Sequence, residues 1–196
     1  MNNVKTHNTA SAIGAKFELR TNVLEYVRPS HVFDAYCGHD GEMYKAVWRE
    51  ADSYLGCDTD YVMWDPRHRM VCDNLIALRA LDLQRFNVFD CDAFSEPWPV
   101  AFLIAARRTW KSGEMGAIVL TNGFSIGARF YRPTSLEWQN ATGLASQNGL
   151  SDQRIVHDVC VNEWIERSGV RVLKRWIARG MGTSQMLYDS IVFEGE

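Results

Sequence analysis

The segment Asp34-Ala-Tyr-Cys-Gly-His-Asp-Gly41 combines carboxylates with two glycines, Gly38 and Gly41. It follows a short apolar run at 31–33 and precedes a helix expected at 42–51. Glycines let a backbone approach a ligand closely, and a helix N-terminus offers N–H donors that have no partner within the helix. The pattern therefore predicts a ligand-binding turn between a strand and a helix.

Asp58 is a second carboxylate with a place in such a site. It closes the apolar run 54–57, at about the distance downstream where nucleotide-binding folds place a ribose-binding acid. A carboxylate can accept hydrogen bonds from both ribose hydroxyls, which a neutral side chain does less well. Thr59, the next residue, is then expected beside the adenine ring. The alternatives are an ordinary tight turn at 34–41 and an aspartate that only caps a loop.

Apolar periodicity predicts the elements that position these residues. Strands are expected at 31–34, 53–58, 69–72, 86–91, 116–121, 170–177 and 185–193. Helices are expected at 16–27, 42–51, 74–84, 100–111 and 152–167, with a hairpin connection at 179–183. The alternation predicts an α/β, doubly wound fold with a mostly parallel seven-stranded sheet. The short last connection makes one strand antiparallel.

Length and composition suit a single domain. The chain has 196 residues, 46% of them hydrophobic, which is enough for one full core at 16–196 behind a flexible tail at 1–15. No apolar run approaches the roughly 18 residues that span a bilayer, and the polar N-terminus lacks the apolar segment of a secretory signal. Five scattered cysteines without a C-x-x-C pair argue against disulfides and zinc. We expect a cytoplasmic protein without a metal centre and without membrane contact.

The charge of the chain bears on its partners. The net charge is −3 and the sequence pI is about 6.0, so the basic excess typical of nucleic-acid-binding proteins is missing. Basic residues still gather locally, as at Arg171, Lys174, Arg175 and Arg179. Such a group indicates either a local binding patch or, more commonly, a solvated face.

The order of elements from about Lys16 to Glu194 resembles that of class I S-adenosylmethionine (SAM)-dependent methyltransferases. This resemblance implies SAM as the cofactor, and it assigns the 34–41 turn, a loose form of the family's D-x-x-x-G-x-x-G-like first motif, to the methionine end. Asp34 would face the ammonium group, directly or through water, and the two glycines would give backbone access. His39 and Asp40 depart from the small residues usual there. The cofactor-binding residues implied are Asp34, Tyr36, Gly38, Gly41, Asp58, Thr59 and Asp73.

Asp73 has two interpretations. It follows the third expected strand, where the resemblance would place an acceptor for the exocyclic amine of adenine. An aspartate at this position also caps a following helix well, because its carboxylate accepts the first backbone N–H groups.

The segment 89–97, Phe-Asp-Cys-Asp-Ala-Phe-Ser-Glu-Pro, resembles the D-x-D-P-F/Y-G-S-P segment of tRNA guanine-N2 dimethyltransferases. The resemblance implies that Asp92 is catalytic and accepts the target N–H, while Phe94 and Trp98 orient the base. Ala93 replaces the family's proline and Ser95 replaces its glycine. The alternative is that Asp92 only finishes a strand and caps a helix.

Two further residues are expected in the acceptor pocket, Asn122 after the fifth strand and Phe124 two residues later. The aromatic side chains of Phe124, Tyr131 and Trp138 suit stacking on a base. They would equally suit packing over an edge of the core. His157, on the helix that precedes the sixth strand, is expected to be structural.

The leading hypothesis is a SAM-dependent methyltransferase that acts on an exocyclic amine of a nucleobase in RNA or DNA. A small-molecule acceptor is the alternative that the acidic charge favours. A non-catalytic SAM-fold binding or regulatory protein is the rival that His39, Asp40 and Ala93 suggest. A nicotinamide dehydrogenase is disfavoured because G-x-G-x-x-G is missing. A protein partner or a second copy of the chain could help to hold a nucleic acid.

Overall fold

The computed structural model describes residues 10–59, 68–123, 134–145, 153–179 and 186–196. Seven strands form one sheet in the order β3-β2-β1-β4-β5-β7-β6. The strands are β1 (His31–Asp34), β2 (Ser53–Asp58), β3 (Arg69–Val71), β4 (Val88–Cys91), β5 (Met115–Asn122), β6 (Val170–Arg179) and β7 (Leu187–Gly195). β7 runs antiparallel to both of its neighbours, β5 and β6, and the other neighbouring strands of the described sheet are parallel. The predicted mostly parallel, doubly wound sheet is confirmed.

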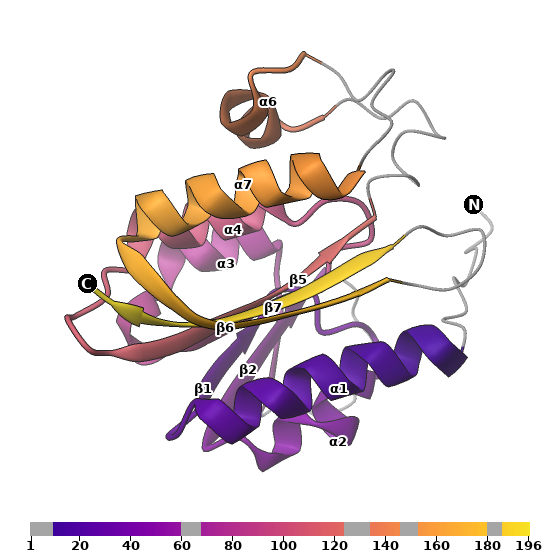
Figure 1. The fold of residues 1–196 in the computed structure, drawn as a ribbon. Coiled ribbons are helices and arrows are strands. Elements are labelled where there is room, and N and C mark those ends of the chain that lie inside the picture. The colour runs from indigo at the N-terminus through magenta and orange to yellow at the C-terminus, as the bar shows by residue number, and fades with distance from the viewer. Residues whose placement is uncertain (1–9, 60–67, 124–133, 146–152, 180–185) are drawn as a thin grey trace.

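Helices cover both faces of the sheet (Figure 1). One face carries α1 (Ala10–Tyr26), α2 (Glu42–Ala46) and the short helix η1 (Trp48–Glu50). The other carries α3 (Asn74–Ala80), α4 (Trp98–Arg107) and α7 (Gln153–Ser168), and the short helix η2 (Leu83–Arg85) follows α3. A further helix, α6 (Leu136–Thr142), lies outside α7 (Figure 1).

Strand alternation divides the core between the two faces. Val32 and Val88 belong to the apolar cluster beneath α1 and α2, whereas Phe33 and Phe89 belong to the larger cluster beneath α3, α4 and α7. Neighbouring residues of a strand point to opposite faces, so each strand supplies both clusters. This is why β5 is apolar from Met115 to Leu120.

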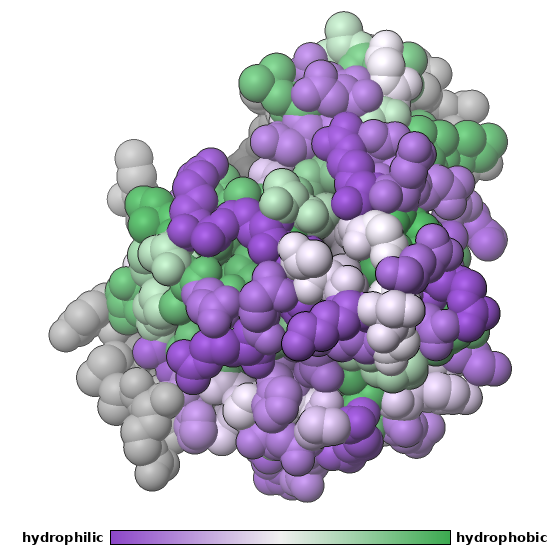
Figure 2. All heavy atoms as spheres, turned by 90° about the vertical axis from the view of Figure 1, so that its left-hand side faces the viewer, coloured by the Kyte–Doolittle hydropathy of each residue, from purple (hydrophilic) through white to green (hydrophobic). Residues whose placement is uncertain are grey.

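The strand order reverses between β1 and β4, both of which end in acidic segments. In open α/β sheets a ligand binds outside the carboxyl ends of the strands at such a reversal. The fold therefore directs attention to the carboxyl edge. Figure 2 shows the opposite side of the molecule, where the C-terminus lies, and its surface is mainly hydrophilic with smaller hydrophobic areas between.

Several boundaries differ from those expected. α1 begins at Ala10, so residues 10–15 belong to a helix rather than to the flexible tail. The expected helix at 42–51 divides into α2 and η1. α6 lies within the stretch 122–149, for which no element was expected. The expected hairpin connection at 179–183 falls mostly outside the described residues.

The described part of the chain was compared with the requirements of a membrane-spanning helix and of a metal site. Within it, no helix combines the length and the apolar character that crossing a bilayer requires. Among the same residues, no group of three or more histidine, cysteine, aspartate or glutamate side chains could hold a metal ion.

Candidate active site

The turn after β1 adopts a conformation that requires glycine. Gly38 has a φ of 69° and Gly41 a φ of 64°, both in the left-handed region. The backbone N–H of Gly38 donates to Oδ2 of Asp58 at 3.0 Å, and the N–H of Cys37 donates to the carbonyl of Cys57 at 3.1 Å. These two hydrogen bonds hold the turn against the end of β2. The predicted glycine turn and Asp58 are therefore in direct contact.

Asp34 lies inside the molecule. Its side chain is 1% exposed, and it accepts hydrogen bonds from the backbone N–H of Tyr36 at 3.0 Å and from the hydroxyl of Tyr54 at 2.9 Å. Burial, together with the neighbouring Asp90 carboxylate, raises the pKa of Asp34 well above its ordinary value. Asp34 therefore supports the turn from beneath, and its expected contact with an ammonium group, directly or through water, stays a prediction.

A pocket of about 110 Å³ opens between the carboxyl ends of β1, β2 and β3. It brings together four of the residues predicted to bind the cofactor, namely Tyr36, Asp58, Thr59 and Asp73. Its lining is Ala35, Tyr36, Asp58, Thr59, Cys72, Asp73 and Asn74. Four predicted cofactor residues therefore line one pocket beside the reversal of the strand order, whereas Asp34, Gly38 and Gly41 do not line it.

Asn74 is a lining residue that the sequence interpretation missed. Its Nδ2 donates to the carbonyl of Ala35 at 3.2 Å, and its side chain also hydrogen-bonds the phenol of Tyr36. Burial is the main reason why the pKa of Tyr36 is raised. The only sequence signal for Asn74 was its position directly after Asp73, at the start of the expected helix.

Asp73 serves as the N-cap of α3. Its Oδ1 accepts from the backbone N–H groups of Leu75 at 2.9 Å and Ile76 at 3.1 Å. The capping interpretation of Asp73 is thus confirmed. Because the same residue lines the pocket and both bonds end on Oδ1, its second oxygen remains a possible ligand contact.

Asp92, the predicted catalytic carboxylate, is held by α1. Lys16 Nζ lies 2.8 Å from Oδ2 of Asp92, and Nη2 of Arg20 lies 3.3 Å from the same oxygen. Burial alone would raise the pKa of Asp92, but the charges of Lys16 and Arg20 outweigh it and hold this pKa below its ordinary value. Asp92 is therefore an ionised carboxylate that already has two cationic partners.

Lys16 and Arg20 were missed as site residues. They lie on one side of α1 together with Val23, at helical spacing, and all three are buried. Charged residues that share the buried stripe of a helix indicate buried acidic partners, so this spacing was the available signal.

The predicted acceptor-binding residues are placed in different surroundings. Phe94 is 46% exposed, whereas Trp98 is fully buried in α4 against Phe102 and His157 and offers no surface for a base. Trp138 is also fully buried, which favours the packing interpretation for this residue. Phe124, like Tyr131, lies outside the described residues.

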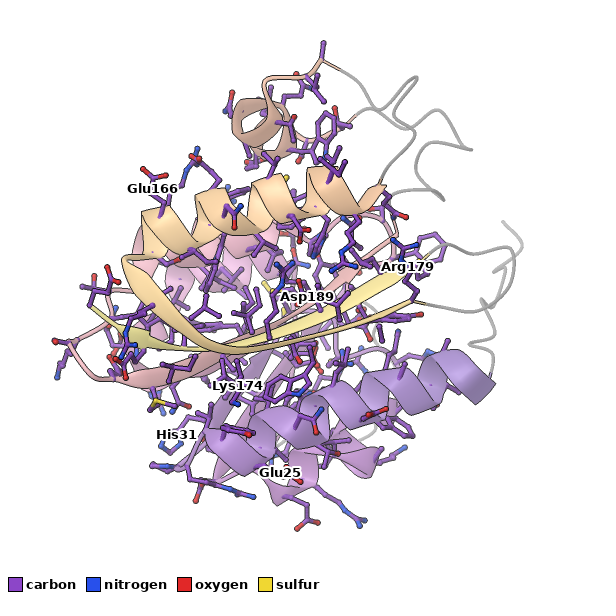
Figure 3. The ribbon with its side chains drawn as sticks, viewed as in Figure 1. Glu25, His31, Glu166, Lys174, Arg179 and Asp189 are labelled. Carbon is purple, nitrogen blue, oxygen red and sulfur yellow. The ribbon has the colours of Figure 1, made fainter. Side chains whose placement is uncertain are left out.

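Asn122 is buried and takes part in a polar network. Its Nδ2 lies 3.1 Å from Nδ1 of His157, whose Nε2 lies 2.9 Å from Oδ2 of Asp189. Asp189, a residue of β7, also accepts from Nε and Nη2 of Arg175, at 2.9 and 2.7 Å, and its side chain points toward α7 (Figure 3). These contacts fit the expected structural role of His157, and they place Asn122 in the same network.

The strand order and the single antiparallel strand are those of class I SAM-dependent methyltransferases, and solved structures agree. No protein-family model and no curated protein matches the sequence. TYW2 of M. jannaschii, solved with AdoMet, has a TM-score of 0.59 and 8% identity, covering 98% of this chain and 80% of that one. The N-methyltransferase NodS of Bradyrhizobium japonicum, solved with S-adenosyl-L-homocysteine (SAH), has a TM-score of 0.59 and 9% identity, covering 99% and 93%.

Trm1 of Pyrococcus horikoshii, solved with S-adenosyl-L-methionine, is a third such structure. Its TM-score is 0.60 at 11% identity, and the match covers 96% of this chain but 56% of the Trm1 chain. Together these structures establish that this protein shares its fold with proteins solved with SAM or SAH, among them the N-methyltransferase NodS.

Proposed function

We propose that this protein is a SAM-dependent methyltransferase. The observation that carries the proposal is the pocket at the carboxyl ends of β1, β2 and β3, which unites Tyr36, Asp58, Thr59 and Asp73. These residues come from three separate segments, and each was named from the sequence as a cofactor contact. The fold supports the same function, because structures that share it bind SAM or SAH.

The chemistry of the pocket fits the nucleoside half of SAM. Asp58 would accept hydrogen bonds from the ribose hydroxyls, and Oδ2 of Asp73 would accept one from the adenine amine. Gly38 and Gly41 would let the turn approach the methionine half. SAM supplies an electrophilic methyl group on a sulfonium, so the protein's own contribution is to bind it and to orient an acceptor.

The acceptor that we propose is an exocyclic amine of a nucleobase in RNA or DNA. Phe94 is an exposed aromatic side chain in the loop that follows β4, where it can stack on a base. Two carboxylates of the same loop, Asp92 and Glu96, can accept a hydrogen bond from the amine. Such a bond orients the nitrogen lone pair for direct attack on the methyl group, with no covalent intermediate on the protein.

Calorimetric titration of SAM into the purified protein tests the proposed function. We expect binding by the wild-type protein and a loss of at least about tenfold in affinity for Asp58→Ala, because a charge-assisted contact is removed. Asp82→Ala is the matched control, since Asp82 caps η2 away from the pocket through the N–H of Gln84. Failure of the folded wild-type protein to bind SAM would refute the proposal.

A small-molecule acceptor is the second candidate, favoured by the net charge of −3. It leaves the cofactor site unchanged and alters only the acceptor. Transfer of a labelled methyl group from SAM to unmodified tRNA transcripts, DNA oligonucleotides and small amines separates the two. SAM binding without transfer to any of them would favour a binding or regulatory protein.

A further inference from the structure

Glu96 carries a buried oxygen that lacks a hydrogen-bond donor. Its Oε1 accepts from the backbone N–H of Ser135, the N-cap of α6, at 2.7 Å. The side chain of Ser135 also hydrogen-bonds this carboxyl. Its Oε2 is buried and makes no hydrogen bond of normal geometry within the described part of the chain. Leaving a carboxylate oxygen buried without a donor is costly, so this atom is a place where a donor on a ligand would be stabilising.

The loop that carries Glu96 is fixed in place against the end of β5. The N–H of Gly123 donates to the carbonyl of Ser95 at 2.6 Å. A Cβ added at Gly123 would lie 2.4 Å from the carbonyl oxygen of Phe94, so only glycine permits this approach. The position of the Glu96 carboxyl is therefore set by backbone contacts on both sides, at Gly123 and at Ser135.

The charge of Glu96 also acts on a residue of the cofactor pocket. Tyr36, which lines that pocket, has its pKa raised first by burial and also by several nearby acidic groups, Glu96 among them. The Glu96 carboxyl is thus within electrostatic reach of the pocket lining. Phe94, two residues earlier in the chain, is the exposed aromatic of the same loop.

Asp92 is less suited to receive an acceptor. Its Oδ2 already contacts both Lys16 and Arg20, which belong to α1 on the opposite face of the sheet from α4 and α6. Its lowered pKa makes it a weak proton acceptor. Glu96 differs in both respects, because burial raises its pKa and one of its oxygens has no donor.

We propose that Oε2 of Glu96 accepts a hydrogen bond from the exocyclic amine of a nucleobase that stacks on Phe94. This inference rests on the proposed function and names the residue that acts in it. The amine nitrogen forms a bond to the methyl carbon, and the carbon–sulfur bond breaks with its electron pair kept by sulfur. The N–H proton of the methylated amine passes to Oε2 of Glu96 and from there to water.

The test uses protein saturated with SAH and titrated with guanosine, adenosine and cytidine, followed by NMR. We expect at least one nucleoside to bind, and Glu96→Gln to weaken that binding by about tenfold or more. In this variant the amide oxygen keeps the bond to Ser135, so an NH2 group replaces Oε2 and opposes the amine of the base. SAH affinity should stay unchanged, which separates this effect from a general structural defect.

Two matched variants complete the experiment. Glu137→Gln makes the same change in α6, outside the loop, and should leave nucleoside affinity unchanged. Asp92→Asn should weaken nucleoside binding less than Glu96→Gln does. The inference is overturned if no nucleoside binds the SAH-loaded wild-type protein, if Glu96→Gln binds as the wild type does, or if Asp92→Asn has the larger effect. Failure of the wild type to bind SAH would instead refute the proposed function.

Discussion

The guanidinium of Arg20 donates to both carboxylate oxygens of Asp90, from Nε at 2.6 Å and from Nη2 at 2.7 Å. Both side chains are fully buried, and the indole N–H of Trp48 adds a third hydrogen bond to Asp90 at 2.7 Å. A bidentate guanidinium–carboxylate pair fixes orientation as well as distance. One buried ion pair thus holds α1 against the strand that leads into the candidate active site.

Replacing Arg20 by Met should destabilise the protein by about 3–5 kcal/mol, because it leaves the buried Asp90 carboxylate without its cation. Urea unfolding, followed by circular dichroism, measures this loss. Arg49→Met is the control, since Arg49 pairs on the surface with Glu50 and both are largely exposed. Its effect should be within about 0.5 kcal/mol. Adding Asp90→Asn to Arg20→Met should restore part of the stability, and no recovery would argue against the ion pair as the cause.

Asp34→Asn should change how stability depends on pH. Burial and the Asp90 carboxylate raise the pKa of Asp34 in the folded protein, so the folded state binds this proton more tightly than the unfolded chain does. The stability of the wild type therefore falls as pH rises from the ordinary aspartate pKa toward the raised one, by up to about 1.4 kcal/mol per pH unit. The Asp34→Asn variant does not lose stability in this way. Its stability relative to that of the wild type should therefore increase as pH rises.

Denaturant unfolding over a series of pH values tests whether the stability difference between variant and wild type increases with pH. Asp52→Asn serves as the control of opposite sign, because the N–H of Ser30 donates to Asp52 at 2.8 Å and lowers the pKa of Asp52. Its contribution is present above the ordinary aspartate pKa and is lost as pH falls through the lowered one. A stability difference for Asp34→Asn that shrinks as pH rises would contradict the prediction.

The local sequence pattern was enough to predict the sheet and several residues that line the pocket. The bounds of β1 and β2 match those expected, because each is an apolar run that ends in an aspartate beside turn-forming residues. Asp58 and Asp73 could be placed together in advance, since the carboxyl ends of neighbouring parallel strands meet at one edge of the sheet.

Contacts between residues far apart in the sequence could not be predicted from the local sequence pattern. Lys16 is 76 residues from Asp92 in the sequence, and neither residue alone indicates the other. A tryptophan such as Trp98 suits a core position and a base-stacking position equally well. Only its burial in the structure distinguishes these two roles. The orphaned oxygen of Glu96 depends on where α6 begins, and α6 is a short helix in a stretch rich in polar residues.

Gly14→Ala should stabilise the protein by about 0.5–1 kcal/mol, because glycine is unfavourable inside a helix. Gly14 is exposed on α1, and a Cβ added there would meet nothing within 4 Å. Thermal unfolding monitored by circular dichroism would detect the gain. The experiment also tests where α1 begins, since Gly14 precedes the helix start expected from the sequence. Unchanged stability would argue that this part of the chain is not helical in solution.

Gly38→Ala should lower stability and SAM affinity together, whereas Gly113→Ala should lower stability alone. Both glycines have φ in the left-handed region, at 69° and 76°, where an alanine costs roughly 1–2 kcal/mol. Neither added Cβ would clash, since the nearest atom to Gly38 is Oδ1 of Asp40 at 3.7 Å and Gly113 has nothing within 4 Å. Backbone strain is therefore the same in kind at both positions.

The difference between these two glycines lies in what their turns hold. The N–H of Gly38 is bonded to Asp58, the residue that we propose binds the ribose, whereas Gly113 precedes β5 at the opposite edge of the sheet. If the turn moves to relieve about 1.4 kcal/mol of strain, SAM affinity should fall about tenfold in Gly38→Ala. Urea unfolding and SAM calorimetry, each applied to both variants, give the two stabilities and the two SAM affinities that are compared. Equal SAM affinities in the two variants would show that the turn after β1 does not shape the cofactor site.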